Sequence, residues 1–118
     1  MEREPRQTLY LPRQLHAQFR EIAVRRGHQM SYLLWCALYT AVLKAKKGEP
    51  LPAERWDGPV RSSPQLRWRQ DTLEYLAWSR LLADAGSSVY AVLVTFIEHY
   101  IEAGGDLTLL GMGVACPA

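Results

Sequence analysis

This chain of 118 residues contains few cysteines and few histidines, and its net charge is small. Two cysteines are too few for a disulfide framework, and Cys36 lies among apolar residues, where a buried thiol acts as a small hydrophobe. This usage suits a reducing cytoplasm. Three histidines on separate segments, without ligand spacing, disfavour a metal site. The formal net charge is only +2, so binding to a polyanion requires locally concentrated positive charge.

Long hydrophobic runs are also missing. The longest uncharged apolar stretch, 89–97, is far shorter than the ~20 residues of a membrane helix. The charged N-terminal sequence MEREPRQTLYLPR has no apolar region of the kind found in a signal peptide. Neither a paired nucleophile and base nor a framed nucleotide loop stands out. We therefore expect a soluble, cytoplasmic protein that is not an enzyme and uses no cofactor or metal.

The chain does contain an internal repeat. Each copy has a short alternating run, a helical pattern, a glycine and a longer helical pattern, and aligning Gly27 with Gly86 gives an offset of 59 positions. At this offset, apolar residues of the first copy align with apolar residues of the second, except that Leu15 aligns with Glu74. This mismatch suggests that the alignment shifts by one residue where the second strand meets its helix. We expect one domain over 1–118, divided into a first repeat (5–47), a linker (48–63), a second repeat (64–105) and a tail (106–118).

The first repeat begins with Leu9 and Leu11 alternating with polar neighbours, the period of a half-buried strand. Pro12 presets φ for a first helical position, and Gly27 ends that helix. A second helix is expected over 29–47. The predicted inner faces are Leu15, Phe19, Ile22 and Ala23 on the first helix, and Met30, Leu33, Leu34, Leu38, Ala41 and Val42 on the second.

The second repeat has Leu66 and Trp68 alternating with arginines, followed by Asp71 and Glu74 in a capping-box pattern. The predicted inner face of its first helix is Leu73, Leu76, Ala77 and Leu81, with Trp78 as a further candidate. That of its second helix is Val89, Val92, Leu93, Phe96, Ile97, Tyr100 and Ile101, ended by Gly104 and Gly105. Prolines and glycines exclude a long helix from the linker, in which Trp56 is a candidate to dock on a helix.

Two short strands in a helical chain leave backbone groups unpaired unless they pair with each other. Antiparallel pairing about a pseudo-dyad places Arg6 near Arg69, Thr8 near Arg67 and Tyr10 near Gln65. With the leucines and Trp68 inward, these six side chains face outward. Such a two-stranded ribbon is narrow enough to enter the major groove of DNA, where arginine, glutamine and threonine can read base edges. The fold class is thus mostly α with one two-stranded antiparallel ribbon.

The segments TLYLPRQLHAQFREIAVRRG and QMSYLL, and then QLRWRQ and AGSSVYAVL, resemble the ribbon-helix-helix family of Arc and MetJ type. Two copies in one chain resemble the tandem, TraY-like arrangement of conjugative plasmids. The resemblance implies an intramolecular pseudo-dimer of two ribbon-helix-helix repeats. It also implies sequence-specific binding of double-stranded DNA, as a transcriptional repressor or as an accessory factor of a plasmid or mobile element.

Carried over by the resemblance, the base-contacting residues are Arg6, Thr8, Tyr10, Gln65, Arg67 and Arg69. The phosphate-contacting residues, at the start of each second helix, are Gln29, Met30 and Ser31, and Ser87, Ser88 and Val89. Free N–H groups at a helix N-terminus suit that role. Two residues depart from the family pattern: Tyr10 replaces a more usual polar reader, and Gln70 takes an inward strand position.

A second hypothesis is a protein-interaction module, antirepressor or antitoxin-like, with a degenerate ribbon-helix-helix fold. The low net charge and the aromatics Tyr32, Trp35, Tyr39 and Trp56, expected to be exposed, favour it, whereas Arg67 and Arg69 favour DNA. Self-association on DNA, or a protein partner bound through the helices or the tail, stays open. No membrane partner is expected.

Overall fold

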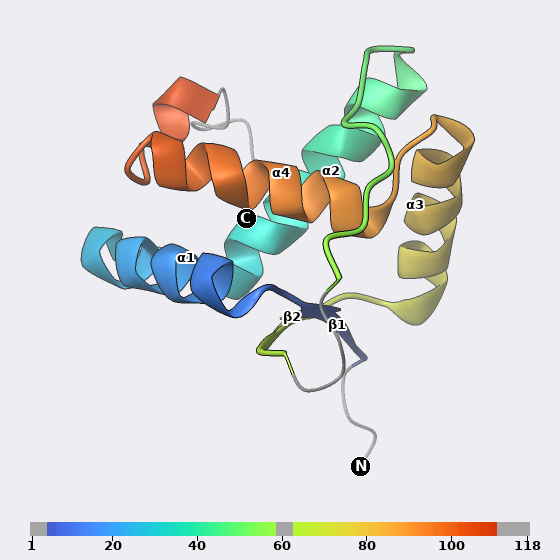
Figure 1. Ribbon diagram of the computed structural model, residues 1–118. Coiled ribbons are helices and arrows are strands. Elements are labelled where there is room, and N and C mark those ends of the chain that lie inside the picture. The colour runs from blue at the N-terminus through green and yellow to red at the C-terminus, as the bar shows by residue number, and fades with distance from the viewer. Residues whose placement is uncertain (1–4, 59–62, 111–118) are drawn as a thin grey trace.

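The computed structural model describes residues 5–58 and 63–110 (Figure 1). In chain order the elements are β1 (Arg6–Tyr10), α1 (Arg13–Arg26), α2 (Met30–Lys46), β2 (Gln65–Arg69), α3 (Thr72–Asp84), α4 (Val89–Glu102) and the 3-10 turn η1 (Leu107–Leu110). The described chain is therefore mostly helical, with one two-stranded antiparallel sheet, as expected from the sequence. The order strand, helix, helix occurs twice.

The two strands pair in the predicted register. Arg6 lies opposite Arg69, Thr8 opposite Arg67, and Tyr10 opposite Gln65. Pairing continues past both ends of the strands, since Leu11 N donates to Pro64 O (2.9 Å) and Gln70 N to Pro5 O (3.3 Å). The side chains of Leu9, Leu11, Leu66 and Trp68 are buried on the inner face. The alternation in the sequence thus separates a core face from a solvent face.

Local signals set the helix ends. Pro12 is the N-cap of α1 rather than its first helical residue (φ −54°), and Gly27 ends α1 in the left-handed conformation (φ 72°). Asp71 Oδ2 accepts a hydrogen bond from Glu74 N (3.1 Å), the first half of the predicted capping box. The Glu74 carboxylate accepts from Gln70 Nε2 (3.1 Å). The described linker residues, 48–58 and 63, contain no helix.

Each first helix packs on the second helix of the other copy. α1 contacts α4, α3 contacts α2, and α2 also contacts α4 and β2 (Figure 1). The C-terminal end of α4 approaches α1 closely, because a Cβ added at Gly105 would lie 2.8 Å from both Arg26 Cγ and Ile22 Cγ2. No single helix in the described residues is long and apolar enough to cross a membrane; α3 and α4 pass such a test only together, and they are bent by 83°.

The inner face predicted for α3 is largely wrong. Leu73 is 77% exposed, Leu76 is 56% exposed, and Ala77 is exposed as well; the residues that face the core are Tyr75, Trp78 and Leu82, with Leu81 half-buried. The expected slip does not occur, because the helix starts at 13 and 72, and at 30 and 89, keep the offset of 59. With no slip, the apolar residues 73, 76 and 77 turn to solvent. On α1, α2 and α4 every residue predicted inward is buried or packed against the core.

The polar pair Gln70 and Glu74 replaces the apolar pair found at the same positions of the first copy, Leu11 and Leu15. Gln70 is buried, and its Oε1 accepts from Trp68 Nε1 (2.9 Å) while its Nε2 donates to Glu74. This explains how a glutamine fits at an inward position of the strand, since its polar atoms have partners.

Two expectations about single residues need correction. Cys36 is buried, as expected for a small apolar residue, but it is disulfide-bonded and is not a free thiol. Trp35 and Tyr39 are half-buried rather than exposed, because their rings stack on each other (5.2 Å) and pack against Trp78 across the α2–α3 contact. Cys116 and most of the predicted tail, 111–118, lie outside the described residues.

Candidate nucleic-acid interface

The outer face of the ribbon carries all six predicted base-contacting residues. Arg6, Thr8, Gln65, Arg67 and Arg69 are exposed, and Tyr10 is half-buried. Arg67 Nε donates to Gln65 Oε1 (3.2 Å), so these two neighbours on β2 orient each other. The face therefore offers three guanidinium groups, one amide and two hydroxyls in two adjacent rows.

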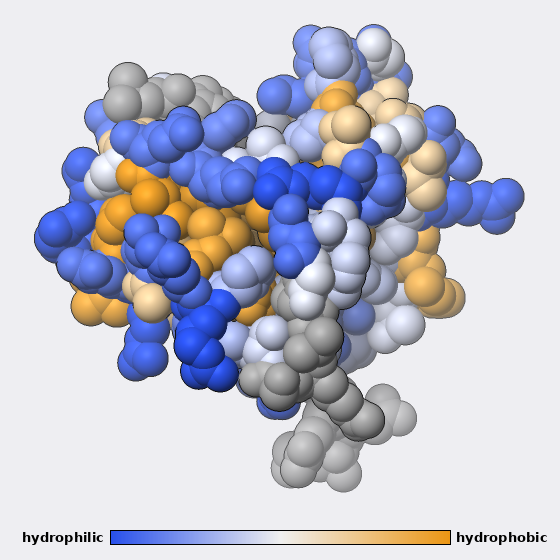
Figure 2. All heavy atoms as spheres, in the orientation of Figure 1, coloured by the Kyte–Doolittle hydropathy of each residue, from blue (hydrophilic) through white to orange (hydrophobic). Residues whose placement is uncertain are grey.

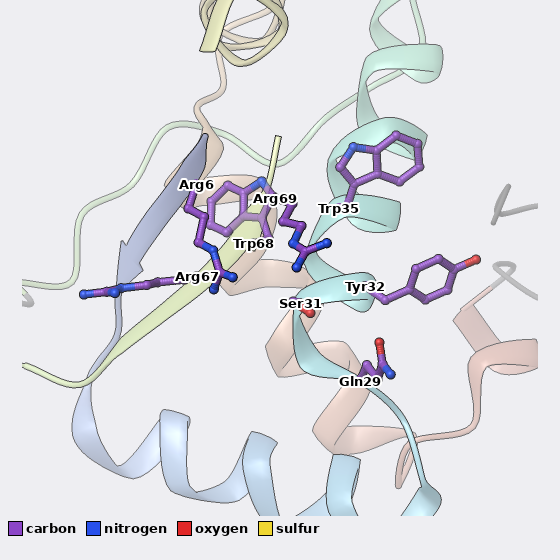
Figure 3. A pocket seen from close by; sticks show the side chains of 8 residues that line it. All are labelled: Arg6, Gln29, Ser31, Tyr32, Trp35, Arg67, Trp68 and Arg69. Atoms are coloured by element: carbon purple, nitrogen blue, oxygen red, sulfur yellow. The ribbon is translucent and has the colours of Figure 1, made fainter. Parts of the chain in front are cut away.

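A hollow of about 600 Å³ lies between the ribbon and the start of α2. Its lining residues are Arg6, Gln29, Ser31, Tyr32, Trp35, Arg67, Trp68 and Arg69 (Figure 3). The side chains of Arg6 and Arg69 point into the space toward α2, whereas Arg67 extends away from α2 (Figure 3). Trp68, from the inner face of the ribbon, is buried. The hollow thus combines cationic side chains with the N-terminal end of a helix.

Within residues 5–58 and 63–110, no side chain caps the N-terminus of α2. Its N-cap residue, Gln29, forms no side-chain capping bond, and the first turn holds no acidic residue. Gln29 and Ser31 are exposed, while Met30 is half-buried against the core. The first N–H groups of an α-helix have no partner within the helix and carry partial positive charge. An anion can therefore approach these groups beside Arg6 and Arg69.

The N-terminus of α4 is covered instead. Ser88 is its N-cap, with Oγ accepting from Ala91 N (3.0 Å). The same hydroxyl donates to Glu54 Oε1 in the linker (3.0 Å), and Glu54 N donates to Gly86 O (3.0 Å). Ser87 is buried, and its hydroxyl has no hydrogen-bond partner among the described residues. A linker carboxylate therefore lies at the helix end where a phosphate was predicted.

Linker residues 54–57 are held on α4 by further contacts. Arg55 bonds Glu98 through both terminal nitrogens (2.7 and 3.2 Å) and pairs with Asp57 (2.9 Å), and these hydrogen bonds raise the pKa of Arg55 above its ordinary value. Tyr90 donates to Asp57 Oδ2 (3.1 Å); burial, and then this bond, raises the pKa of Tyr90. The Trp56 ring lies 4.8 Å from the Tyr90 ring, the helix docking expected from the sequence.

The six predicted phosphate-contacting residues are therefore divided by their surroundings. Gln29, Met30 and Ser31 border an open basic hollow, whereas Ser87, Ser88 and Val89 lie buried or half-buried at a capped helix end. We define the linker strap as Glu54, Arg55, Trp56 and Asp57. The docking of Trp56 was predicted from sequence, whereas the polar contacts of Glu54, Arg55 and Asp57 were not, although these residues form a charge-rich run, ERWD, between prolines.

Comparison with protein-family models, curated protein sequences and solved structures finds no match to this chain. Within residues 5–58 and 63–110, no group of three or more His, Cys, Asp or Glu side chains is placed to hold a metal ion.

Proposed function

We propose that this chain binds double-stranded DNA by inserting the β1–β2 ribbon into the major groove. The observation that carries the proposal is the strand register, which aligns Arg6 with Arg69 and Thr8 with Arg67 on one exposed face. A two-stranded ribbon fits the major groove, and arginine bound to guanine is the commonest specific contact there. The two strand–helix–helix segments then act as an intramolecular pseudo-dimer of ribbon-helix-helix type.

The open N-terminus of α2 serves as the phosphate anchor in this proposal. Uncapped helical N–H groups and two nearby arginines border the same hollow, and backbone donors at helix ends are common phosphate contacts. The α4 end contributes less, since the Glu54 carboxylate occupies it. DNA binding is consequently asymmetric, and the preferred site is non-palindromic. A transcriptional repressor and an accessory factor of a plasmid or mobile element both need such a binder.

A salt titration tests the proposal. For B-DNA, the logarithm of the binding constant falls with the logarithm of salt concentration by about 0.9 for each phosphate neutralised. We expect a steep slope for the whole chain and a shallower one for Arg6→Gln, with Lys46→Gln at the far end of α2 as the control. Binding that hardly responds to salt would count against a phosphate-contacting interface.

A protein-interaction module is the second candidate, and the exposed Leu73 and Leu76 on α3 favour it. Large apolar side chains grouped on a surface often mark a protein contact. The same titration separates the two, because docking through apolar side chains is insensitive to moderate salt. Enzyme activity forms no part of either candidate.

A further inference from the structure

A cavity of about 260 Å³ lies between α2, α4 and the linker. Its apolar lining comes from Ala37 and Ala41 on α2, Val92 and Phe96 on α4, and Leu51 in the linker. Figure 1 shows the linker running past α2 and across α4, and Figure 2 shows hydrophobic atoms among hydrophilic ones over this end of α2. Closely packed helices leave few gaps larger than a water molecule. A space of this size next to core residues of both copies therefore suits a small ligand.

Four polar side chains line the same cavity, Thr40 and Lys44 from α2 and Thr95 and His99 from α4. The two threonines are half-buried, whereas Lys44 and His99 are exposed. In the described parts of the chain, none of the four side chains forms a hydrogen bond or an ion pair. Binding sites for small molecules combine an apolar lining with a few polar groups that fix the orientation of the ligand. These four side chains are available for that role.

The charge of the cavity is positive. Lys44 is a cation and His99 offers a ring N–H in either protonation state, while no acidic residue is among the lining residues. The acidic residue next to His99 in α4, Glu98, is paired with Arg55 (2.7 Å). Two further acidic residues, Glu49 after α2 and Glu102 at the end of α4, do not line the cavity. The cavity therefore favours a ligand with a negatively charged group over a neutral or positively charged one.

We propose that this cavity binds a small organic acid as its carboxylate, with an apolar body of one ring or a short hydrocarbon chain. The apolar body lies among Ala41, Val92 and Phe96, and the carboxylate bonds to Lys44 and His99, where it stays partly in water. The volume is slightly below the range of about 300–1,000 Å³ for sites of drug-sized ligands, so the ligand is smaller than these. The cavity shares no residue with the ribbon, and the proposal is independent of DNA binding.

The test uses three compounds that share one ring and differ in charge. Benzoate is an anion, benzamide is neutral and benzylamine is a cation. Each is titrated into the isotope-labelled whole chain without DNA, up to about 10 mM, a range that covers weak binding, and the amide resonances are followed by NMR. We expect benzoate to shift resonances of residues around the cavity on both α2 and α4. Benzamide should bind more weakly by a factor of about 1.4 to 5, as expected for one exposed charge, and benzylamine more weakly still.

Two variants separate the apolar and the charged part of the site. Thr95→Leu fills the cavity and should abolish benzoate binding, and Thr40→Leu fills it from the α2 side if Thr95→Leu alters the circular dichroism spectrum. Lys44→Gln should weaken benzoate binding by a factor of about 1.4 to 5 and leave benzamide binding unchanged. Lys46→Gln, the same change at an exposed residue outside the lining, is the control and binds benzoate like the wild type.

Three results overturn the proposal. The first is that benzoate leaves the resonances around the cavity of the wild-type chain unchanged, including the case in which it shifts only those of the ribbon, where arginines attract any anion. The second is that benzamide binds as tightly as benzoate, which removes the role of charge. The third is that a folded cavity-filling variant binds benzoate like the wild type, which places the bound benzoate elsewhere.

Discussion

The two strand–helix–helix segments of this chain share one geometry but differ at the helix end nearest the ribbon. α2 begins with an uncapped N-terminus beside Arg6 and Arg69, whereas α4 begins with Ser88 as a cap and with the Glu54 carboxylate bound to it. Because both segments belong to one chain, their sequences differ, and the linker covers the N-terminus of α4 but not that of α2.

The inner side of the ribbon differs between the halves as well. Leu9 and Leu11 in β1 and just after it correspond to Trp68 and Gln70 in the second copy, and all four are buried. An indole N–H in the core requires an acceptor, and Gln70 supplies it (2.9 Å). The second half thus adds a buried hydrogen bond between two side chains, whereas in the first half the half-buried Gln7 donates to the backbone oxygen of Gln70 (3.2 Å).

The largest expected effect is a loss of stability on truncating the second half of the ribbon. Trp68→Ala should lower the free energy of unfolding by about 3–5 kcal/mol, because a large buried side chain is removed and a cavity remains. Leu9→Ala, its counterpart, should cost less, since fewer atoms are lost and no hydrogen bond breaks. Denaturant unfolding measures both. Equal losses of unfolding free energy in Trp68→Ala and Leu9→Ala would contradict the larger contribution that we assign to Trp68.

Gln70→Leu makes the second half resemble the first. We expect a loss of about 1–3 kcal/mol, because the Trp68 N–H is left buried without an acceptor. Adding Trp68→Phe removes that N–H, so the double variant should recover part of the loss. A double variant whose loss equals the sum of the two single losses would contradict the role given to the hydrogen bond.

Glu54→Gln should make the N-terminal ends of α2 and α4 more alike in charge. The amide keeps an acceptor for Ser88 but removes the negative charge. We expect DNA affinity at low salt to rise by a factor of about 1.4 to 5, since one exposed charge contributes about 0.2–1 kcal/mol. Fluorescence anisotropy with labelled duplexes measures this, with Glu49→Gln at the far end of the linker as the control. Unchanged or weaker binding would mean that the α4 end does not face DNA.

The smallest expected effect concerns His16 on α1, whose counterpart on α3 is the uncharged Tyr75. Burial, and then the nearby Arg20, lowers the pKa of His16 below 6.5. The unfolded chain therefore binds a proton more readily, and stability is fully present above about pH 6.5 and falls as the pH drops below it. His16→Gln should flatten the dependence of the unfolding free energy on pH between about 5 and 7. An identical pH dependence in the variant would exclude this cause.

The ribbon could be predicted from sequence because a period of two fixes which side chains face inward, and because both strands are short and otherwise unpaired. The pairing of Thr8 with Arg67 followed from the repeat alone, and the register confirms it. The roles in DNA binding assigned to these residues stay predictions.

The features that could not be predicted from sequence depend on contacts between residues that are far apart in the chain. An apolar residue in a helix does not by itself show whether it faces the core. The mismatch of Leu15 with Glu74 led us to expect a one-residue slip that does not occur, and Leu73 and Leu76, which were predicted to face inward, are exposed. The polar contacts of the linker strap were missed for a similar reason. Short proline-rich segments carry no periodicity, and only the tertiary structure brings Glu54 to Ser88 and Arg55 to Glu98.

The central claim is that the outward face of the ribbon reads DNA sequence, and selection of bound duplexes from a random pool tests it most directly. The wild-type chain should enrich one non-palindromic sequence. Arg67→Ala should relax the preference at one or two positions, since a bidentate contact to guanine discriminates by about 1–3 kcal/mol. Enrichment that Arg67→Ala leaves unchanged, or no enrichment by the wild-type chain, would contradict the claim.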